Sequence, residues 1–259
     1  MDKEKLLKFA NNKDEKLVIS KLIDTASYAV KTNYVKCTKF LNGREQVLAS
    51  YVFNSMGVSY RFFGGYDEYE RAIAVCFTDE MYLDTYKYPV KILDVKVRDG
   101  DKLNHRDYLG SIMGLGIKRE MIGDIIADKF GAKVFVLDEI AEYLKAQITK
   151  IGKLGAKVEI YEVGNIIIPN REYKDISFTV SSPRIDSIVS GATGVSRSEA
   201  VSLISGGNVS LNWETVISHS KTVDQCQILS VKGHGRYKID SVGGVTKKGR
   251  IFITVKKFI

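Results

Sequence analysis

The stretch 184–213 constrains the fold most, because it holds two helix signals, a glycine break and a strand signal within thirty residues. The first signal is a set of apolar residues at the three- and four-residue spacing of a helix: Ile185, Ile188 and Val189. Gly191 and Gly194 are expected to break this helix. Ser196, three residues before Glu199, is typical of a capping box. We therefore predict two short helices joined at a glycine turn.

A strand is predicted after the second helix, because apolar residues there alternate with polar ones: Val209, Leu211 and Trp213. Arg184 and Arg197 stand at or near the predicted helix starts. A helix start offers unpaired backbone amides and the positive end of the helix dipole, and a guanidinium adds a planar fork of donors suited to phosphate. The pattern therefore predicts a clamp for the backbone of a nucleic acid.

This stretch resembles the RNA-binding domain named after small-subunit ribosomal protein four, written here as the S-four domain. The family pattern is Arg-hydrophobic-Asp, then Ser-Arg-x-x-Ala, then Ile-x-x-Gly-x-Val-x-hydrophobic-Asn. The matching residues are Arg184, Ile185, Asp186, Ser196, Arg197, Ala200, Ile204, Gly207, Val209 and Asn212. The chain departs from it by one residue of spacing near Gly207, and by Cys226 and Gln227 where the family has a Gly-Asp turn. The resemblance implies an αL-type S-four RNA-binding domain over 182–259, with Ser196, Ser198 and Asn212 beside the arginines. The alternative is a helical hairpin whose arginines pair with Asp186 or Glu199 at its surface.

Most of the net positive charge of the chain lies in residues 182–259. Residues 182–259 hold eleven Lys and Arg against five Asp and Glu, which is most of the net charge of +8. Such asymmetry is expected of a module that faces a polyanion. A membrane-surface segment would need a basic amphipathic helix, whereas the cations here lie mainly on strand and turn sequence. RNA is therefore the expected partner, and no membrane is.

Further strands are predicted at 228–231, 237–239 and 250–255, separated by glycine turns. Long cations at turns and strand ends can reach a phosphate track without entering the core. The residues that we expect to widen the RNA contact in this way are Lys232, Arg236, Lys238, Lys247, Lys248 and Arg250.

The rest of the chain suggests an α+β protein of three small domains. Residues 1–85 alternate two helical patterns, at 16–31 and 44–53, with strands at 58–63 and 72–77, which indicates an N-terminal helical and β unit. Residues 86–168 have the order strand, helix, helix, strand, helix, strand, with the second helix at 119–127. That order favours a ferredoxin-like middle domain. A polar linker is expected at 169–181, although 176–180 has the apolar content of a strand.

The segment 105–124 is rich in glycine and charge for a helical region, and it allows several interpretations. His105-Arg106-Asp107 is similar to a kinase catalytic loop, but the other kinase motifs are missing. Gly114 and Gly116 could begin a dinucleotide-binding loop, but the third glycine of that motif is missing. Two interpretations stay open: a turn that holds phosphate through Lys118 and Arg119, or a tight turn between helices.

The same segment resembles bacterial proteins of the YlmH/RqcP type, through His105 to Gly110 and Gly116 to Asp124. These proteins carry an S-four domain after two smaller domains, and the likeness spans nearly the whole chain. The resemblance implies an RNA-binding protein without catalytic residues. It would bind rRNA or tRNA on the large ribosomal subunit and support peptidyl-tRNA during C-terminal tailing of stalled chains. His105, Arg106, Lys118 and Arg119 are then possible secondary RNA contacts.

Two other functions remain possible at this point. S-four domains are also attached to RNA-modifying enzymes, although there the module precedes the catalytic domain and nothing here offers a methyl-donor loop. A cell-division factor is the third candidate. No apolar run is long enough to cross a membrane and no secretory signal is evident, so a cytoplasmic protein is expected. The three scattered cysteines and the absence of zinc-site spacing predict reduced thiols and no metal, and we expect no cofactor and no small-molecule substrate.

Overall fold

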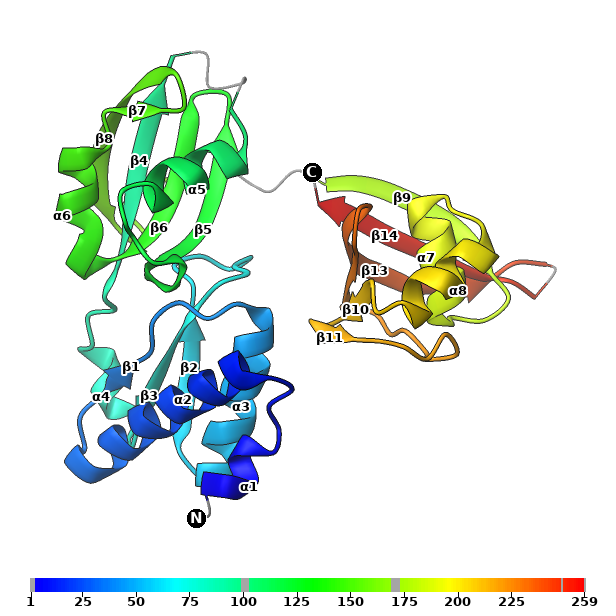
Figure 1. The fold of residues 1–259 in the computed structure, drawn as a ribbon, viewed down its shortest axis with the longest axis horizontal. Coiled ribbons are helices and arrows are strands. Elements are labelled where there is room, and N and C mark those ends of the chain that lie inside the picture. Colours follow the sequence, from blue (N-terminus) through cyan, green and yellow to red (C-terminus); the bar gives the residue numbers. More distant parts are fainter. Residues whose placement is uncertain (1–2, 99–102, 169–172, 248, 259) are drawn as a thin grey trace. The chain divides into compact units, whose positions relative to one another are not determined.

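The computed structural model describes residues 3–98, 103–168, 173–247 and 249–258. The chain is a mixed α+β protein that divides into two compact units, Met1–Pro169 and Asn170–Ile259 (Figure 1). The first unit holds two buried apolar clusters and the second unit holds one. The units are therefore described separately.

The first unit begins with helices packed on a small antiparallel sheet of order β1-β3-β2. Its elements are α1 (Lys3–Leu7), α2 (Lys13–Thr32), β1 (Lys36–Cys37), α3 (Gly43–Met56), β2 (Ser59–Phe63), β3 (Ile73–Phe77) and α4 (Met81–Asp84). Helix α3 starts with a complete capping box, in which Asn42 accepts from the Glu45 amide and Glu45 accepts from the Asn42 amide. The helices and strands predicted for this region are present, with ends that differ by a few residues.

The second sheet of this unit has the order β5-β6-β4-β8-β7, with every neighbouring pair antiparallel. Its elements are β4 (Val90–Val97), α5 (His105–Met113), β5 (Ile122–Asp128), β6 (Gly131–Leu137), α6 (Asp138–Gln147), β7 (Lys150–Ile151) and β8 (Leu154–Glu162). Strand β6 lies between β4 and β5, which α5 connects, and β4 lies between β6 and β8, which α6 connects. This is the split arrangement of a ferredoxin-like motif.

The prediction of a helix at 119–127 is wrong. A short 3-10 turn, Arg119–Met121, leads directly into β5, which pairs with β6. The isoleucines Ile122, Ile125 and Ile126 are buried in this strand. Their apolar spacing also suits a helix, but β-branched side chains fit better on a strand that is covered on both faces.

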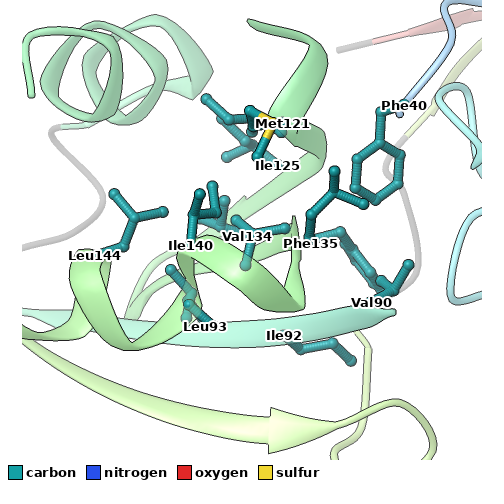
Figure 2. Packing of buried hydrophobic residues seen from close by; sticks show 14 of the residues in the cluster. Phe40, Val90, Ile92, Leu93, Met121, Ile125, Val134, Phe135, Ile140 and Leu144 are labelled. Carbon is teal, nitrogen blue, oxygen red and sulfur yellow. The ribbon is translucent and has the colours of Figure 1, made fainter. Parts of the chain in front are cut away.

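Both sheets of the first unit contribute residues to one buried cluster, and a second cluster lies between the first sheet and its helices. The domains predicted at 1–85 and 86–168 therefore form a single compact unit. Phe40, Ile73 and Phe77 belong to the same buried cluster as Val90 and Phe135. Figure 2 shows Phe40 close to Phe135 and Val90, with Ile140 and Leu144 of α6 farther along the same core. Apolar contact across the predicted boundary accounts for this difference.

A buried carboxylate joins the two parts of the first unit. Asp124 of β5 accepts hydrogen bonds from the Tyr66 hydroxyl at 2.7 Å and from the backbone amides of Glu70 and Arg71 at 2.6 and 3.1 Å. The Arg71 guanidinium donates to the carbonyl oxygens of Ile122 and Phe40. Asp124 therefore fixes the segment before β3 against the second sheet.

The second unit is a sheet of order β11-β10-β12-β13-β14-β9, with the helices α7 and α8 lying against one face (Figure 1). Its elements are β9 (Tyr173–Val180), α7 (Ile185–Thr193), α8 (Arg197–Ser205), β10 (Val209–Leu211), β11 (Glu214–Thr215), β12 (Ile228–Val231), β13 (Gly235–Val245) and β14 (Ile251–Phe258). The linker prediction is wrong for β9, which pairs with β14 along its whole length. Residues 169–172 lie outside the described residues.

Helix α7 continues through Gly191 and ends at Gly194, whose φ of 80° is left-handed. The break predicted at Gly191 is therefore wrong. A Cβ at Gly191 would lie 2.3 Å from the Phe178 ring of β9, so the glycine allows the helix to approach the strand closely. The residue that looked like a helix breaker is needed for helix–sheet packing.

Replacing Asp124 tests the junction in the first unit. In Asp124→Ala, three donors lose their acceptor, and we expect the free energy of unfolding of this unit to fall by about 3 kcal/mol or more. Asp124→Asn keeps one acceptor oxygen and should lose less. Urea denaturation followed by circular dichroism measures both, with the exposed Asp14→Ala as control. Equal stability of Asp124→Ala and the wild type would contradict the proposed role.

Candidate nucleic-acid interface

The two predicted clamp arginines meet at one buried carboxylate. Arg184 donates from Nε to Asp186 Oδ1 and from Nη2 to Asp186 Oδ2, both at 3.2 Å. Arg197 donates from Nε and Nη2 to Asp186 Oδ2 at 3.2 and 3.1 Å. The Asp186 side chain is only 3% exposed, whereas those of Arg184 and Arg197 are 36% and 56% exposed. The pairing with Asp186 that the alternative interpretation expected is thus present, and both guanidinium groups still reach solvent.

The arginines control the ionisation of this carboxyl group. Burial alone would raise the pKa of Asp186, but the hydrogen bonds and positive charges of Arg197 and Arg184 outweigh it and hold the pKa below its ordinary value. Asp186 therefore stays ionised at neutral pH. Two positive groups and one negative group leave the cluster with a net positive charge, held in one place by Asp186.

The start of α7 is closed by a loop that sequence reasoning missed. The carbonyl oxygens of Lys221 and His219 accept from the amides of Ile185 and Asp186, at 2.8 and 3.4 Å. These amides are among those that we expected to be open to an anion, so that expectation is wrong for α7. The signal in the sequence is weak, because the loop between β11 and β12 contributes backbone atoms here.

The start of α8 differs from that of α7. The Ser196 hydroxyl accepts from the Glu199 amide at 3.2 Å, which is the serine half of the predicted capping box. Within the described residues, the amides of Arg197 and Ser198 have no hydrogen-bond acceptor. Ser198 is exposed beside Arg197. The anion-binding geometry predicted for both helices is therefore present at α8 only.

Two other predicted contacts have structural roles. Asn212 and Trp213, with φ of 48° and 63°, form the two-residue turn between β10 and β11. The Asn212 side chain also accepts from the Ile228 amide at 2.9 Å, and so ties the turn to β12. Arg250 donates from Nε to the Thr179 hydroxyl at 3.0 Å and so joins the start of β14 to β9. Whether these residues also touch RNA stays a prediction.

The remaining predicted cations of the second unit lie at turns and along β13. Lys232 and Lys247 are exposed at turns. Arg236 and Lys238 alternate along β13 with Tyr237 and Ile239, which are buried in the core beneath the helices. Arg236 and Lys238 therefore lie on the face of the sheet that is opposite to the helix pair. Lys248 lies outside the described residues.

The possible secondary contacts of the first unit are also divided. His105 and Arg106 are exposed in the first turn of α5, and Lys118 is exposed before the 3-10 turn. Arg119 instead turns inward and donates to the carbonyl oxygens of Ile122 and Gly123. Burial, with the nearby charge of Arg71, lowers the pKa of Arg119 to about 10. The prediction that Arg119 contacts RNA is therefore not supported by its geometry.

No helix among the described residues combines the length and the apolar content needed to cross a membrane. No group of three or more His, Cys, Asp or Glu side chains in the described ranges is placed to hold a metal ion.

Comparison with known proteins adds to this geometry. The family model described as "Putative RNA-binding domain in YlmH" matches residues 79–165, which include the ferredoxin-like sheet. The first unit thus carries an RNA-binding domain of the YlmH class. Ribosome-associated protein quality control protein P2 of Bacillus subtilis (strain 168) is 31% identical over 248 residues, which cover 95% of this chain and 96% of that protein. The chain therefore belongs to the YlmH/RqcP family.

A solved structure is also similar. Cell division protein ylmH from Streptococcus pneumoniae aligns with a TM-score of 0.49 and 16% sequence identity, and the alignment covers 59% of this chain and 93% of that chain.

The Asp186 cluster makes stability depend on pH. Because the pKa of Asp186 is lowered in the folded state, its stabilising effect is present above the unfolded pKa of about 4 and is lost as the pH falls through the lower folded value. Asp186→Asn should destabilise the second unit by about 1–3 kcal/mol at pH 7. This difference should shrink below about pH 4. Thermal unfolding of both proteins between pH 7 and pH 3 measures it, and a difference that does not change with pH would contradict the assignment.

Proposed function

We propose that this chain is a non-catalytic protein that binds structured RNA on the large ribosomal subunit during quality control of stalled translation. The observation that carries the proposal is the pair of arginines at the starts of α7 and α8, whose partly exposed side chains are held together by the buried carboxylate of Asp186. The similarity to a ribosome-associated quality control protein over nearly the whole chain supports the setting.

The geometry explains how the cluster can recognise a phosphate backbone. Asp186 fixes both arginines before RNA arrives, so less side-chain entropy is lost on binding. The amides of Arg197 and Ser198 lie at the positive end of the α8 dipole. These groups recognise phosphate and shape and carry little information about bases. Binding to folded rRNA or tRNA is therefore favoured over recognition of a base sequence.

The second unit supports the interpretation as an S-four domain. It places two short helices, the Ser196 cap and the strand β10 in the order that the motif requires. The YlmH-class domain of the first unit supplies a second candidate RNA contact through His105, Arg106 and Lys118. Two contacts on two units suit a protein that supports peptidyl-tRNA against rRNA during C-terminal tailing.

Substituting the clamp arginines tests this function. Arg184→Ala and Arg197→Ala should each weaken binding to a structured rRNA or tRNA, by about 1 kcal/mol or more for a charge-assisted contact, and should lower the slope of log affinity against log salt by about 0.7–0.9. With about six phosphate contacts, the wild type should lose affinity about a thousandfold between about 50 and 200 mM salt. Filter binding across this range provides the measurement.

Control variants distinguish the effect of the planar guanidinium group from the effect of its positive charge. Arg197→Lys keeps the charge and loses the planar fork, so it should retain the salt slope with reduced affinity. Lys174→Ala removes an exposed cation of β9 that we do not place in the site. Sedimentation with large ribosomal subunits in sucrose gradients measures whether each variant still binds the subunit. Unchanged RNA and subunit binding by both alanine variants would overturn the proposal.

A further inference from the structure

The sheet of the second unit has one covered face and one open face. Residues of the covered face belong to the core shared with α7 and α8, and include Tyr237, Ile239, Ile253 and Val255. Side chains alternate between the faces of a strand, so their sequence neighbours face the other way. Because Phe178 lies under Gly191 of α7, the strand β9 follows the same division. We call the side away from the helices the outer face.

Aromatic side chains lie on the outer face. Phe258 of β14 pairs with Tyr173 of β9, and their rings meet edge to face with centroids 5.3 Å apart. The Arg236 guanidinium lies over the Phe258 ring at 4.9 Å from its centroid. Farther along β14, Phe252 pairs with Thr179 and is 51% exposed. A large aromatic ring that stays half exposed near the start of β14 contributes little to the core.

Cations accompany these rings. Lys238 of β13 lies directly opposite Lys256 of β14, and like charges in that position are unfavourable. Asp240 balances Lys256 through an ion pair of 2.9 Å. No described carboxylate within ion-pair distance balances Lys238. Asp175 of β9 also lies opposite Lys256 on this face. The outer face thus combines aromatic rings with three cations, Arg236, Lys238 and Lys256, against two carboxylates, Asp175 and Asp240, which is a small excess of positive charge.

We propose that the outer face is a second RNA-binding surface, on which an unpaired base of a single-stranded segment stacks on the exposed ring of Phe252 while Lys238 and Arg236 attract the phosphates. The proposal deepens the proposed function, since it rests on RNA being the ligand of this unit. Aromatic platforms on a sheet with flanking cations accept any base through its ring face. A protein partner would use the rings equally well, but the excess of cations favours a polyanion.

The two surfaces differ in what they recognise. The clamp presents cations and helix amides without exposed rings, which suits folded RNA, whereas the outer face presents rings, which suit unstacked bases. The sheet separates them, so one phosphate track cannot follow both directly. The second unit should therefore hold two RNA segments at once, or one strand that passes around an edge of the sheet.

The test uses the full chain with two RNAs, a structured hairpin and an unstructured oligouridine. Phe252→Ala should weaken oligouridine binding about fivefold or more, in keeping with the stacking of one base, and should leave hairpin binding within about twofold. Phe252→Trp should bind oligouridine at least as well as the wild type, and its added fluorescence should be quenched by the oligonucleotide. Ile217→Ala, which shortens an apolar side chain that is 70% exposed in the same unit, is the matched control.

The outcomes distinguish this proposal from the proposed function. Loss of hairpin binding in Arg197→Ala, together with unchanged oligouridine binding in Phe252→Ala, would leave the proposed function standing and overturn the outer surface. Unchanged binding of both RNAs by Arg184→Ala and by Arg197→Ala would overturn the proposed function instead. If Phe252→Ala weakens binding to large subunits but not to oligouridine, the outer face contacts a protein, and the proposal is wrong. Thermal unfolding checks that each variant remains folded.

Discussion

A buried carboxylate that accepts several donors organises each unit, and much of the remaining structure depends on these two groups. Asp124 binds a tyrosine hydroxyl and two amides that belong to another part of the first unit. Asp186 binds two guanidinium groups that belong to different helices. A buried charge is tolerated only when its partners are complete, so both sites fix their surroundings in a single arrangement. In the first unit the result is a joint between two sheets, and in the second it is a rigid pair of cations.

The sequence predicted the elements of this protein better than their grouping. Capping residues such as Ser196 and the apolar spacing of Ile185 and Ile188 are local signals, and the helices they predicted are present. Ile125 and Ile126 suit a helix and a strand equally, and only pairing with β6 decides between them. Gly191 has the same ambiguity, because its role depends on Phe178 from another element. Contacts between distant segments, which one sequence does not display, account for these errors.

The candidate site shows the same limit. Arg184, Asp186 and Arg197 could be selected from a motif, and the structure brings them together. The cations of the later strands could be listed, but the side of the sheet that each one faces depends on register and on the position of the helices. Arg119 looked like a surface cation beside a glycine turn and is instead a donor to backbone carbonyls. The direction in which each side chain points decides whether it is available at the surface or used within the fold, and the composition of the chain carries no information about that direction.

The position of β9 has a consequence for the order in which the protein forms. This strand precedes the helix pair in the chain, yet within the described residues it pairs only with β14, the last strand, in a register that joins Tyr173 to Phe258. Such a distant pairing closes a long loop and forms slowly. During synthesis, α7 would have no complete sheet to pack on until β14 had left the ribosome. The helix pair, and with it the arrangement of Arg184 and Arg197 around Asp186, can therefore reach its final packing only after β14 has been synthesised.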